Sequence, residues 1–289
     1  MQTNKRHILV TGAAGFIGFH LCLLLKKNKD YVIGCDNFND YYELPLKYIR
    51  ASKLKKEGIE VLETDINHLD SYHKFFVKKN ITHVVHLAAQ AGVRYSLTHP
   101  HVYVHSNLSG LTKALELTKK LKASFIFASS SSVYGGNKKT PFSETDITKD
   151  PLSFYAATKI SGEAIAKSYH HLFNIPITIL RFFTVYGPWG RPDMAYYLFA
   201  KNIMDQKPIP VFNHGVMQRD FTYVDDILDG IFKAINRCKG YSIFNLGNNK
   251  PEPLMNLIKC LENSLERKAV IRYKEMQPGD VQKTVPDLS

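Results

Sequence analysis

A tyrosine and a lysine four residues apart could carry proton chemistry in this chain. Residues 155–159 read Tyr-Ala-Ala-Thr-Lys, and on a helix this spacing places Tyr155 and Lys159 on one face. A tyrosine with the reference pKa of about 10 is a poor base at neutral pH, but a neighbouring positive charge favours its phenolate. Tyr155 could then exchange a proton with a substrate hydroxyl. The alternative is an ordinary surface pair, because this spacing occurs on many helices.

A run of serines could place a further hydroxyl beside that tyrosine. Residues 129–132 are all serine and are followed by Val-Tyr-Gly, directly after the apolar run 124–128. If that run is a strand, the serines lie where the strand ends, which is the ligand-binding edge of a parallel sheet. A serine hydroxyl there could donate a hydrogen bond to the oxygen that reacts with Tyr155, or accept one from it.

A glycine-rich turn predicts a bound dinucleotide. Gly12, Gly15 and Gly18 lie between a short apolar run and an amphipathic helical pattern, in the order G-x-x-G-x-x-G. Glycine permits positive φ and close approach of the backbone to a pyrophosphate, which the start of the following helix attracts. Asp36 ends the next apolar run, where a carboxylate binds ribose hydroxyls and repels a 2′-phosphate, so NAD is favoured over NADP. The alternatives are a plain strand–turn–helix corner and a turn-forming aspartate.

The elements around these residues indicate an α/β fold. Strands are predicted at 7–11, 31–35, 59–63, 83–86, 124–128 and 177–181, with helical patterns between them. This alternation predicts a doubly wound parallel sheet of the Rossmann type, covered by helices on both faces. The expected division is a NAD-binding domain over residues 1–184 and a smaller substrate lobe over 185–289. Helices are expected near 195–206, 224–236 and 253–267, and the boundary is soft because the helix near 230 could return to the sheet.

Composition narrows the functional classes. The 289 residues are 44% hydrophobic and 22% charged, with a formal net charge of +12. The lysines are scattered through helical patterns, which predicts a solvated basic surface and no nucleic-acid partner. No apolar run has the length of a membrane span or of a signal peptide, so we expect no membrane partner and a cytoplasmic location. The four cysteines lack metal-ligand spacing; they are expected to be reduced thiols, and no metal site is predicted.

Six segments make the chain resemble the extended short-chain dehydrogenase/reductase family over nearly its whole length, and within it the UDP-glucuronate 4-epimerases. They are Thr11–Gly18, His86–Ser96, Ser129–Gly135, Tyr155–Lys159, Arg181–Met194 and Gln218–Asp226. The segments His86–Ser96 and Arg181–Met194 contain Ala-Gly-Val-Arg-Tyr-Ser and Arg-Phe-Phe-Thr-Val-Tyr-Gly-Pro-Trp-Gly-Arg-Pro-Asp-Met, which are the more specific to the uronate epimerases.

The resemblance implies a role for each candidate residue. Tyr155 is implied as the base, Lys159 as the group that lowers the pKa of Tyr155 and holds the nicotinamide ribose, and Ser130 as the partner of the reacting 4-hydroxyl. The implied cofactor-binding residues are Gly12, Gly15, Phe16, Ile17, Gly18, Asp36, Asp65, Ala88 and Lys159. The implied substrate-binding residues are Arg94, Ser131, Ser132, Thr184, Arg191, Arg219 and Asp280. For Asp65 the alternative is a helix N-cap, and for each arginine it is a surface salt bridge.

The implied reaction is C4 epimerisation of UDP-glucuronate to UDP-galacturonate with NAD, through a transient 4-keto sugar. Related dehydratases carry Asp-Glu, and related decarboxylases carry Glu, where this chain has Ser131 and Ser132. Small hydroxyls can bind the sugar carboxylate without a second negative charge, which favours epimerisation with the carboxyl group retained. The alternatives are a UDP-glucose or UDP-N-acetylglucosamine 4-epimerase, or a NAD-binding protein with little catalysis.

The resemblance also implies expectations about the length of the chain and its assembly. Its members usually continue some tens of residues past Gly279-Asp280, so the substrate lobe is expected to be C-terminally truncated in a chain that stops at Ser289. Related enzymes commonly pair through two helices per subunit. A homodimer through the helices expected at 98–121 and 153–174 is therefore predicted.

Overall fold

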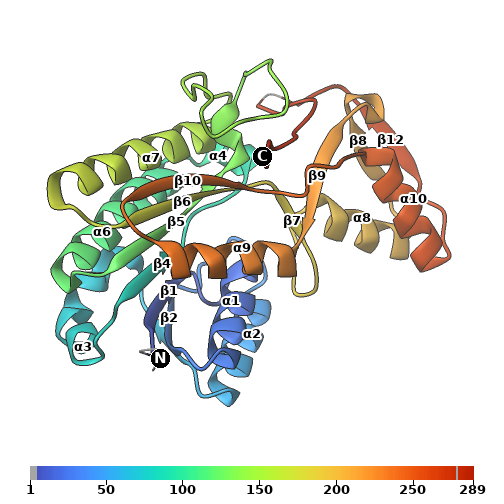
Figure 1. The fold of residues 1–289 in the computed structure, drawn as a ribbon. Helices are drawn as coiled ribbons and strands as arrows, with labels where there is room; N and C mark the ends of the chain where they lie inside the picture. The colour runs from blue at the N-terminus through green and yellow to red at the C-terminus, as the bar shows by residue number, and fades with distance from the viewer. Residues whose placement is uncertain (1–4, 278) are drawn as a thin grey trace.

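The computed structural model describes residues 5–277 and 279–289, with helices and strands alternating through most of the chain (Figure 1). The strands are β1 (His7–Thr11), β2 (Tyr31–Asp36), β3 (Glu60–Glu63), β4 (His83–His86), β5 (Ser124–Ser130), β6 (Ile177–Phe182), β7 (Thr184–Tyr186), β8 (Ile209–Phe212), β9 (Gln218–Tyr223), β10 (Tyr241–Leu246), β11 (Pro251–Pro253) and β12 (Ile271–Lys274). The α-helices are α1 (Phe16–Lys27), α2 (Leu44–Lys56), α3 (His73–Lys78), α4 (Val93–Thr98), α5 (Pro100–Tyr103), α6 (Gly110–Leu121), α7 (Phe154–Phe173), α8 (Ala195–Met204), α9 (Val224–Arg237) and α10 (Leu254–Leu265).

The large layer is built on a seven-stranded sheet in the order β10-β6-β5-β4-β1-β2-β3. Every neighbouring pair in it is parallel. The chain runs outward from β1 to β3, then returns to β4 on the other side of β1, so the strand order reverses between β1 and β4. Ligands of such sheets bind beyond the carboxyl ends of the strands at this point.

Helices cover both faces of this sheet, which confirms the predicted doubly wound α/β fold. One apolar core joins α1 and α9 to the sheet, and a second joins α3, α6 and α7 to the opposite face. In Figure 1, α1, α2 and α9 accordingly lie on one side of the strands, and α6 and α7 on the other. The six predicted strands are present within one or two residues. The sequence analysis did not identify the seventh, β10, as part of the sheet.

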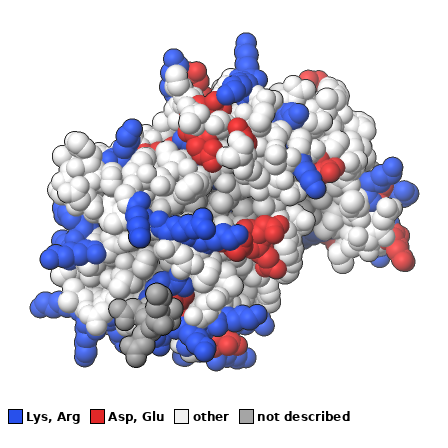
Figure 2. All heavy atoms as spheres, in the orientation of Figure 1, with Lys and Arg blue, Asp and Glu red and all other residues white. Residues whose placement is uncertain are grey.

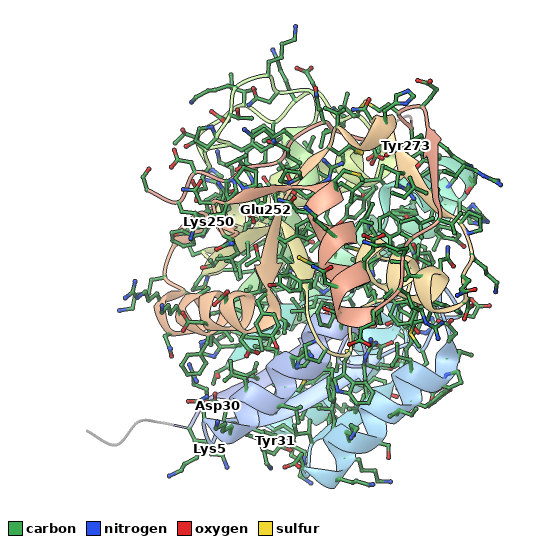
Figure 3. All side chains as sticks on the ribbon, turned by 90° about the vertical axis from the view of Figure 1, so that its right-hand side faces the viewer. Lys5, Asp30, Tyr31, Lys250, Glu252 and Tyr273 are labelled. Atoms are coloured by element: carbon green, nitrogen blue, oxygen red, sulfur yellow. The ribbon has the colours of Figure 1, made fainter. Side chains whose placement is uncertain are left out.

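The smaller layer carries its own apolar core. It contains a three-stranded sheet, β11-β9-β7, and a two-stranded sheet, β12-β8, with α8 and α10 packed beside them. Figure 3 places Asp30 and Tyr31 at the end of the large layer, far from Tyr273 of the small layer. The chain crosses between the layers more than once, because α9 and β10 follow β9 yet pack in the large layer.

The surface charge follows the ends of the helices. Basic side chains occupy the last turns of α1, α2, α3 and α6, and Asp225 and Asp226 occupy the first turn of α9. Figure 2 shows blue side chains along the rim of the large layer and a red group near the start of α9. Each arrangement complements the helix dipole, which favours cations at the C-terminus and anions at the N-terminus. Among the residues described, no helix is long and apolar enough to cross a membrane.

Candidate active site

The glycine turn has the geometry of a phosphate-binding loop at the start of α1. Gly12 has φ of +72°, which L-residues with side chains rarely adopt. A Cβ on Gly18 would lie 2.1 Å from the carbonyl oxygen of Gly12, so the turn and the helix can pack this closely only with glycine. The helix then directs its unpaired N–H groups and its positive end at the space above β1. This space is suited to a pyrophosphate.

Asp36 lies at the end of β2, where it could accept hydrogen bonds from a ribose. Its carboxylate accepts hydrogen bonds from the backbone N–H of Ala14 at 3.0 Å and of Phe38 at 2.9 Å. The contact with Phe38 is the turn-forming bond weighed as the alternative, and the same carboxylate also lines the cavity. Burial raises the pKa of Asp36, whereas its two backbone hydrogen bonds and the positive charge of Lys47 oppose the rise.

Lys47 is a buried cation beside Asp36 that was not among the residues predicted for the site. Lys47 is 4% exposed, and its Nζ donates to the carbonyl oxygen and to Oδ1 of Asn39, each at 2.6 Å. Both residues line the cavity. Its helix carries several other lysines that are exposed, and residue type alone did not distinguish Lys47 from them. The spacing could have done so, because Lys47, Arg50 and Leu54 share one helical face and are all buried.

Asp65 is the one candidate site residue that does not line the cavity. It is the N-cap of the short 3₁₀ helix Ile66–Tyr72, and its carboxylate accepts from the backbone N–H of Asn67 at 2.9 Å. Asp65 therefore has the helix N-cap role that was given as the alternative to cofactor binding. The carboxylate also accepts from Nδ2 of Asn37 at 2.9 Å, and Asn37 and Ile66 line the cavity in its place.

The serine run and Tyr155 meet at the end of β5. Ser130 caps the short helix Ser131–Tyr134, and its Oγ lies 3.1 Å from both the N and the Oγ of Ser132. Tyr155 is in the first turn of α7, which Ser153 caps by accepting from the N–H of Ala156. Burial raises the pKa of Tyr155, while Ser130 and the positive charge of Arg191 act in the opposite direction.

Lys159 lies one turn further along α7, buried beside the same strand. Its Nζ donates to the carbonyl oxygen of Ala128 at 2.7 Å and lies 5.9 Å from the centre of the Tyr155 ring. Burial lowers the pKa of Lys159 to about 8, although the negative charge of Glu163 opposes this effect. The ammonium group is therefore held where its charge can stabilise a phenolate on Tyr155.

Three charged residues form the far end of the cavity. Nη2 of Arg94 lies 3.8 Å from Oδ2 of Asp280, and its guanidinium lies 4.8 Å from the centre of the Phe212 ring. Burial lowers the pKa of Arg219, and Asp280 opposes this. The salt bridge weighed as the alternative for Arg94 is thus present, and the same side chain lines the cavity. Two guanidiniums beside an aromatic ring can bind a diphosphate and a flat base.

Arg191 lies in the loop after β7 and lines the same cavity, near enough to Tyr155 for its charge to act on that hydroxyl. Its guanidinium pairs with Asp193, with Nε donating to Oδ1 at 3.0 Å, and Tyr41 donates to Oδ2 of Asp193 at 3.0 Å. Burial alone would lower the pKa of Arg191, but the negative charge of Asp193 raises that pKa above the usual range. Arg191 was predicted for the site, whereas Asp193 and Tyr41, which orient it, were not.

One cavity of about 960 Å³ brings these groups together. The candidate site residues that line it are Gly12, Gly15, Phe16, Ile17, Gly18, Asp36, Ala88, Arg94, Ser130, Ser131, Ser132, Tyr155, Lys159, Thr184, Arg191, Arg219 and Asp280. They come from both layers. The cavity thus runs from the glycine turn, past a tyrosine–lysine pair, to a basic end in the smaller layer.

The chain matches the NAD dependent epimerase/dehydratase family over residues 8–247. It belongs to this family. It is 48% identical to UDP-glucuronate 4-epimerase 4 of Arabidopsis thaliana over 305 residues, covering 99% of this chain and 70% of the relative. It is 46% identical to Protein CapI of Staphylococcus aureus, covering 97% and 90%. Among solved structures, UDP-glucuronic acid 4-epimerase from Bacillus cereus in complex with UDP-glucuronic acid and NAD has a TM-score of 0.91 and 38% identity, covering 98% and 90%.

The geometry of this member of the epimerase/dehydratase family fits its dinucleotide. The turn can form only with glycine, because a Cβ on Gly12 or Gly18 would collide with the backbone of Ala88 or of Gly12, and Asp36 lies one strand away, where a carboxylate suits ribose hydroxyls. Lys159 lies at the other end, with its Nζ 5.9 Å from the centre of the Tyr155 ring. The recognition of the family and of its cofactor from the sequence is confirmed.

Proposed function

We propose that the protein interconverts UDP-glucuronate and UDP-galacturonate by NAD-dependent epimerisation at C4. The single observation that carries the proposal is the shared cavity. Its lining includes Ser130, Tyr155 and Lys159 together with the glycine turn, the arginines and two further serines, which supports the proposal. Two of the proteins named above, from Arabidopsis thaliana and Bacillus cereus, are UDP-glucuronate 4-epimerases, and they match 99% and 98% of this chain.

The glycine turn, Asp36 and Lys159 would hold NAD, which when bound supplies a hydride acceptor that is restored within each turnover. Tyr155 removes the proton from the C4 hydroxyl and later returns one to the new hydroxyl. Ser130 holds the same oxygen through a hydrogen bond. Arg191 favours the phenolate by its charge, and Lys159, whose Nζ lies 5.9 Å from the centre of the Tyr155 ring, would stabilise it in the same way. The sugar turns over between the two half-reactions, so its C4 can be reached from either face.

The sugar carboxylate would be bound by neutral hydroxyl groups. Ser131, Ser132 and Thr184 line the cavity on the side of Tyr155, and none of them brings a second negative charge. Hydrogen bonds from such groups can hold a carboxylate in a fixed orientation. A carboxylate held in this way is retained while C4 is a ketone.

The nucleotide end would be bound by the arginines. Arg191 and Arg219 provide guanidinium groups for the diphosphate, and Arg94 with Asp280 closes the pocket beside Phe212. Guanidinium groups match phosphate oxygens in charge and in geometry.

We further propose that the protein is a homodimer in a reducing compartment, the cytoplasm. The helices expected to pair expose the apolar side chains of Val104, Leu172 and Phe173, with 45%, 63% and 44% of their surface accessible. The cysteines described are free thiols, which supports a reducing compartment. Sedimentation of the purified protein would measure its mass directly, and a monomer at micromolar concentration would contradict the dimer.

The experiment for the function is a product assay without an external reductant. The protein with NAD should convert UDP-glucuronate into UDP-galacturonate to an equilibrium mixture, which anion-exchange chromatography resolves. Tyr155→Phe is the matched control, because it removes one hydroxyl and should retain NAD. Absence of interconversion by protein with bound NAD would refute the proposal. A UDP-pentose as the main product would indicate decarboxylation instead. Faster turnover of UDP-glucose or UDP-N-acetylglucosamine would indicate a neutral sugar.

A further inference from the structure

The loop that carries Arg191 is docked onto the helices of the cofactor-binding half. Trp189, the only tryptophan of the chain, packs in this loop with its ring centre 5.7 Å from that of Phe19 on α1. Nζ of Lys53 on α2 lies 5.2 Å from the same ring. In Figure 1 the loop between β7 and α8 extends toward α1 and α2. The backbone around Arg191 is therefore placed by contacts far from Arg191 in sequence.

A buried arginine on α2 joins this loop to the glycine turn. Arg50 is 0% exposed. Its Nη1 donates to the carbonyl oxygen of Ala14 at 2.9 Å, inside the glycine turn. Its Nη2 donates to the carbonyl oxygens of Trp189 at 2.6 Å and Gly190 at 3.3 Å, the two residues before Arg191. One guanidinium thus bonds to the cofactor turn and to the substrate loop at once.

The chemical setting of Arg50 argues against a role in stability alone. Within the described residues no carboxylate lies in ion-pair contact with it, and its Nε has no hydrogen-bond partner. Its remaining partner is the hydroxyl of Tyr42 at 2.8 Å. The carboxylate of Asp36 is near enough to interact with this charge but does not contact it. A buried charge that lacks a direct ion pair is costly, and an apolar side chain would fill the same space at less cost. What an apolar side chain cannot do is hold three carbonyl oxygens from two separate segments.

The segment before Arg50 orients the side chain of Arg191 as well. Tyr41 donates to Asp193, and Asp193 binds the guanidinium of Arg191 through both oxygens. Arg50 therefore sets the backbone of the loop, while Tyr41 and Asp193 set the direction of the charge. Both contacts come from the segment 41–50, which begins five positions after Asp36.

We propose that Arg50 is a positioning residue that fixes the Arg191 loop to the cofactor turn, and that Tyr41 and Asp193 orient Arg191 for the diphosphate of the sugar nucleotide. The inference rests on the proposed function only in that Arg191 binds a sugar nucleotide. Since Arg50 does not line the cavity, its loss acts through the two segments that it holds, and saturating NAD isolates the effect that passes through the loop. The affinity for UDP and the KM for the UDP-sugar should change more than kcat measured at saturating substrate and NAD.

The test compares Arg50→Lys, Asp193→Asn and Lys55→Met with the unmodified protein, all loaded with NAD. Lysine keeps the charge of Arg50 but lacks the fork that reaches both segments. We expect Arg50→Lys to weaken UDP binding, measured by calorimetry, by about tenfold, the factor that corresponds to 1.4 kcal/mol. The emission of Trp189 should move to longer wavelength as its ring becomes more exposed. Asp193→Asn should weaken UDP binding to a similar degree and leave the emission unchanged. Lys55→Met removes an exposed charge from the same helix and should change neither quantity.

The outcomes separate this inference from the proposed function. UDP serves as the probe because it needs no turnover, so weaker UDP binding in Arg50→Lys and Asp193→Asn supports the inference even if UDP-glucuronate is not epimerised. Unchanged UDP affinity in both variants would overturn it. Weaker binding in Arg50→Lys with unaltered Trp189 emission would overturn the role of the loop. If Arg50→Lys does not fold, Asp193→Asn decides: native UDP affinity in that variant refutes the orientation of Arg191.

Discussion

Glu163 should support catalysis through Lys159 without touching the substrate. It lies one helical turn after Lys159 on α7, is 7% exposed and does not line the cavity. Its carboxylate accepts from the hydroxyl of Ser129 at 2.6 Å and from Nε and Nη2 of Arg181 at 2.9 and 2.7 Å. We predict that Glu163→Gln lowers kcat at neutral and mildly alkaline pH while the KM for the UDP-sugar changes little.

The magnitude follows from the charge that the substitution removes. Side chains one turn apart on a helix are about 6 Å apart, and at an effective dielectric constant of about 20 two such charges interact by roughly 2–3 kcal/mol. Burial already lowers the pKa of Lys159 to about 8, and Glu163 is the group that opposes this. With glutamine in its place, the positive charge of Arg181 remains and the pKa of Lys159 falls further. The protonated fraction of Lys159 at pH 8, and kcat with it, should drop about tenfold or more.

The direction of the pH dependence is set by the depressed pKa. In the unmodified protein Lys159 carries its charge below about pH 8 and loses it above, so kcat should decline on the alkaline side as the pH passes about 8. In Glu163→Gln this decline should begin at lower pH. The measurement is kcat against pH for both proteins at saturating substrate and NAD.

Two controls separate this effect from damage to the fold. Breaking the buried pair leaves Arg181 unpaired, which costs about 3–5 kcal/mol, so the melting temperature should fall and assays belong well below it. Glu116→Gln removes a carboxylate that pairs with Lys119 at 2.7 Å near the surface of α6, and it should leave the pH profile unchanged. The reasoning is refuted if kcat declines at the same alkaline pH in Glu163→Gln as in the unmodified protein.

Three further substitutions test other parts of the site. Tyr155→Phe should lower kcat by about 10²–10⁴-fold, which is the usual contribution of a positioned acid–base group. Its NAD content, measured from the absorbance of the extract of the denatured protein, should not change. A smaller loss of kcat would exclude Tyr155 as the base. Gly18→Ala places a Cβ 2.1 Å from the Gly12 carbonyl oxygen and should abolish NAD retention through gel filtration, and retained NAD would contradict the turn geometry. Ser132→Glu should raise KM for UDP-glucuronate by about tenfold or more through like-charge repulsion while changing KM for UDP-glucose much less, and equal effects on both sugars would place the carboxylate elsewhere.

The large layer could be predicted from the sequence because its strands are encoded locally. Runs such as His7–Thr11 and His83–His86 are apolar, short and bounded by turns, so their limits follow from residue type. Strand β10 was harder, because Phe244 in its middle is 48% exposed and the run lacks a buried pattern. Its place in the sheet depends on pairing with β6, a contact between residues more than sixty positions apart.

The residues of the candidate site also differ in how far local sequence reveals their roles. Gly12, Tyr155 and Lys159 occur in short motifs with fixed spacing, and spacing is visible in a sequence. Asp65 follows a strand in the same manner as Asp36, yet its carboxylate is taken up in capping the next helix, and only the path of the chain decides between the two roles.

Lys47 and Arg50 show why buried charges escape a reading based on residue type. In sequence they belong to a lysine-rich amphipathic helix that resembles a solvated surface, and Lys53 and Lys55 of that helix are indeed exposed. In the folded chain the other face of α2 packs against the glycine turn and the loop at Trp189, so the same residue type becomes a buried donor. A buried charge with no carboxylate in direct contact lowers stability, and it is retained where a carbonyl oxygen or a ligand requires it. The departures from local patterning in α2 therefore fall where the cofactor turn meets the substrate loop, as expected if that junction serves function rather than stability.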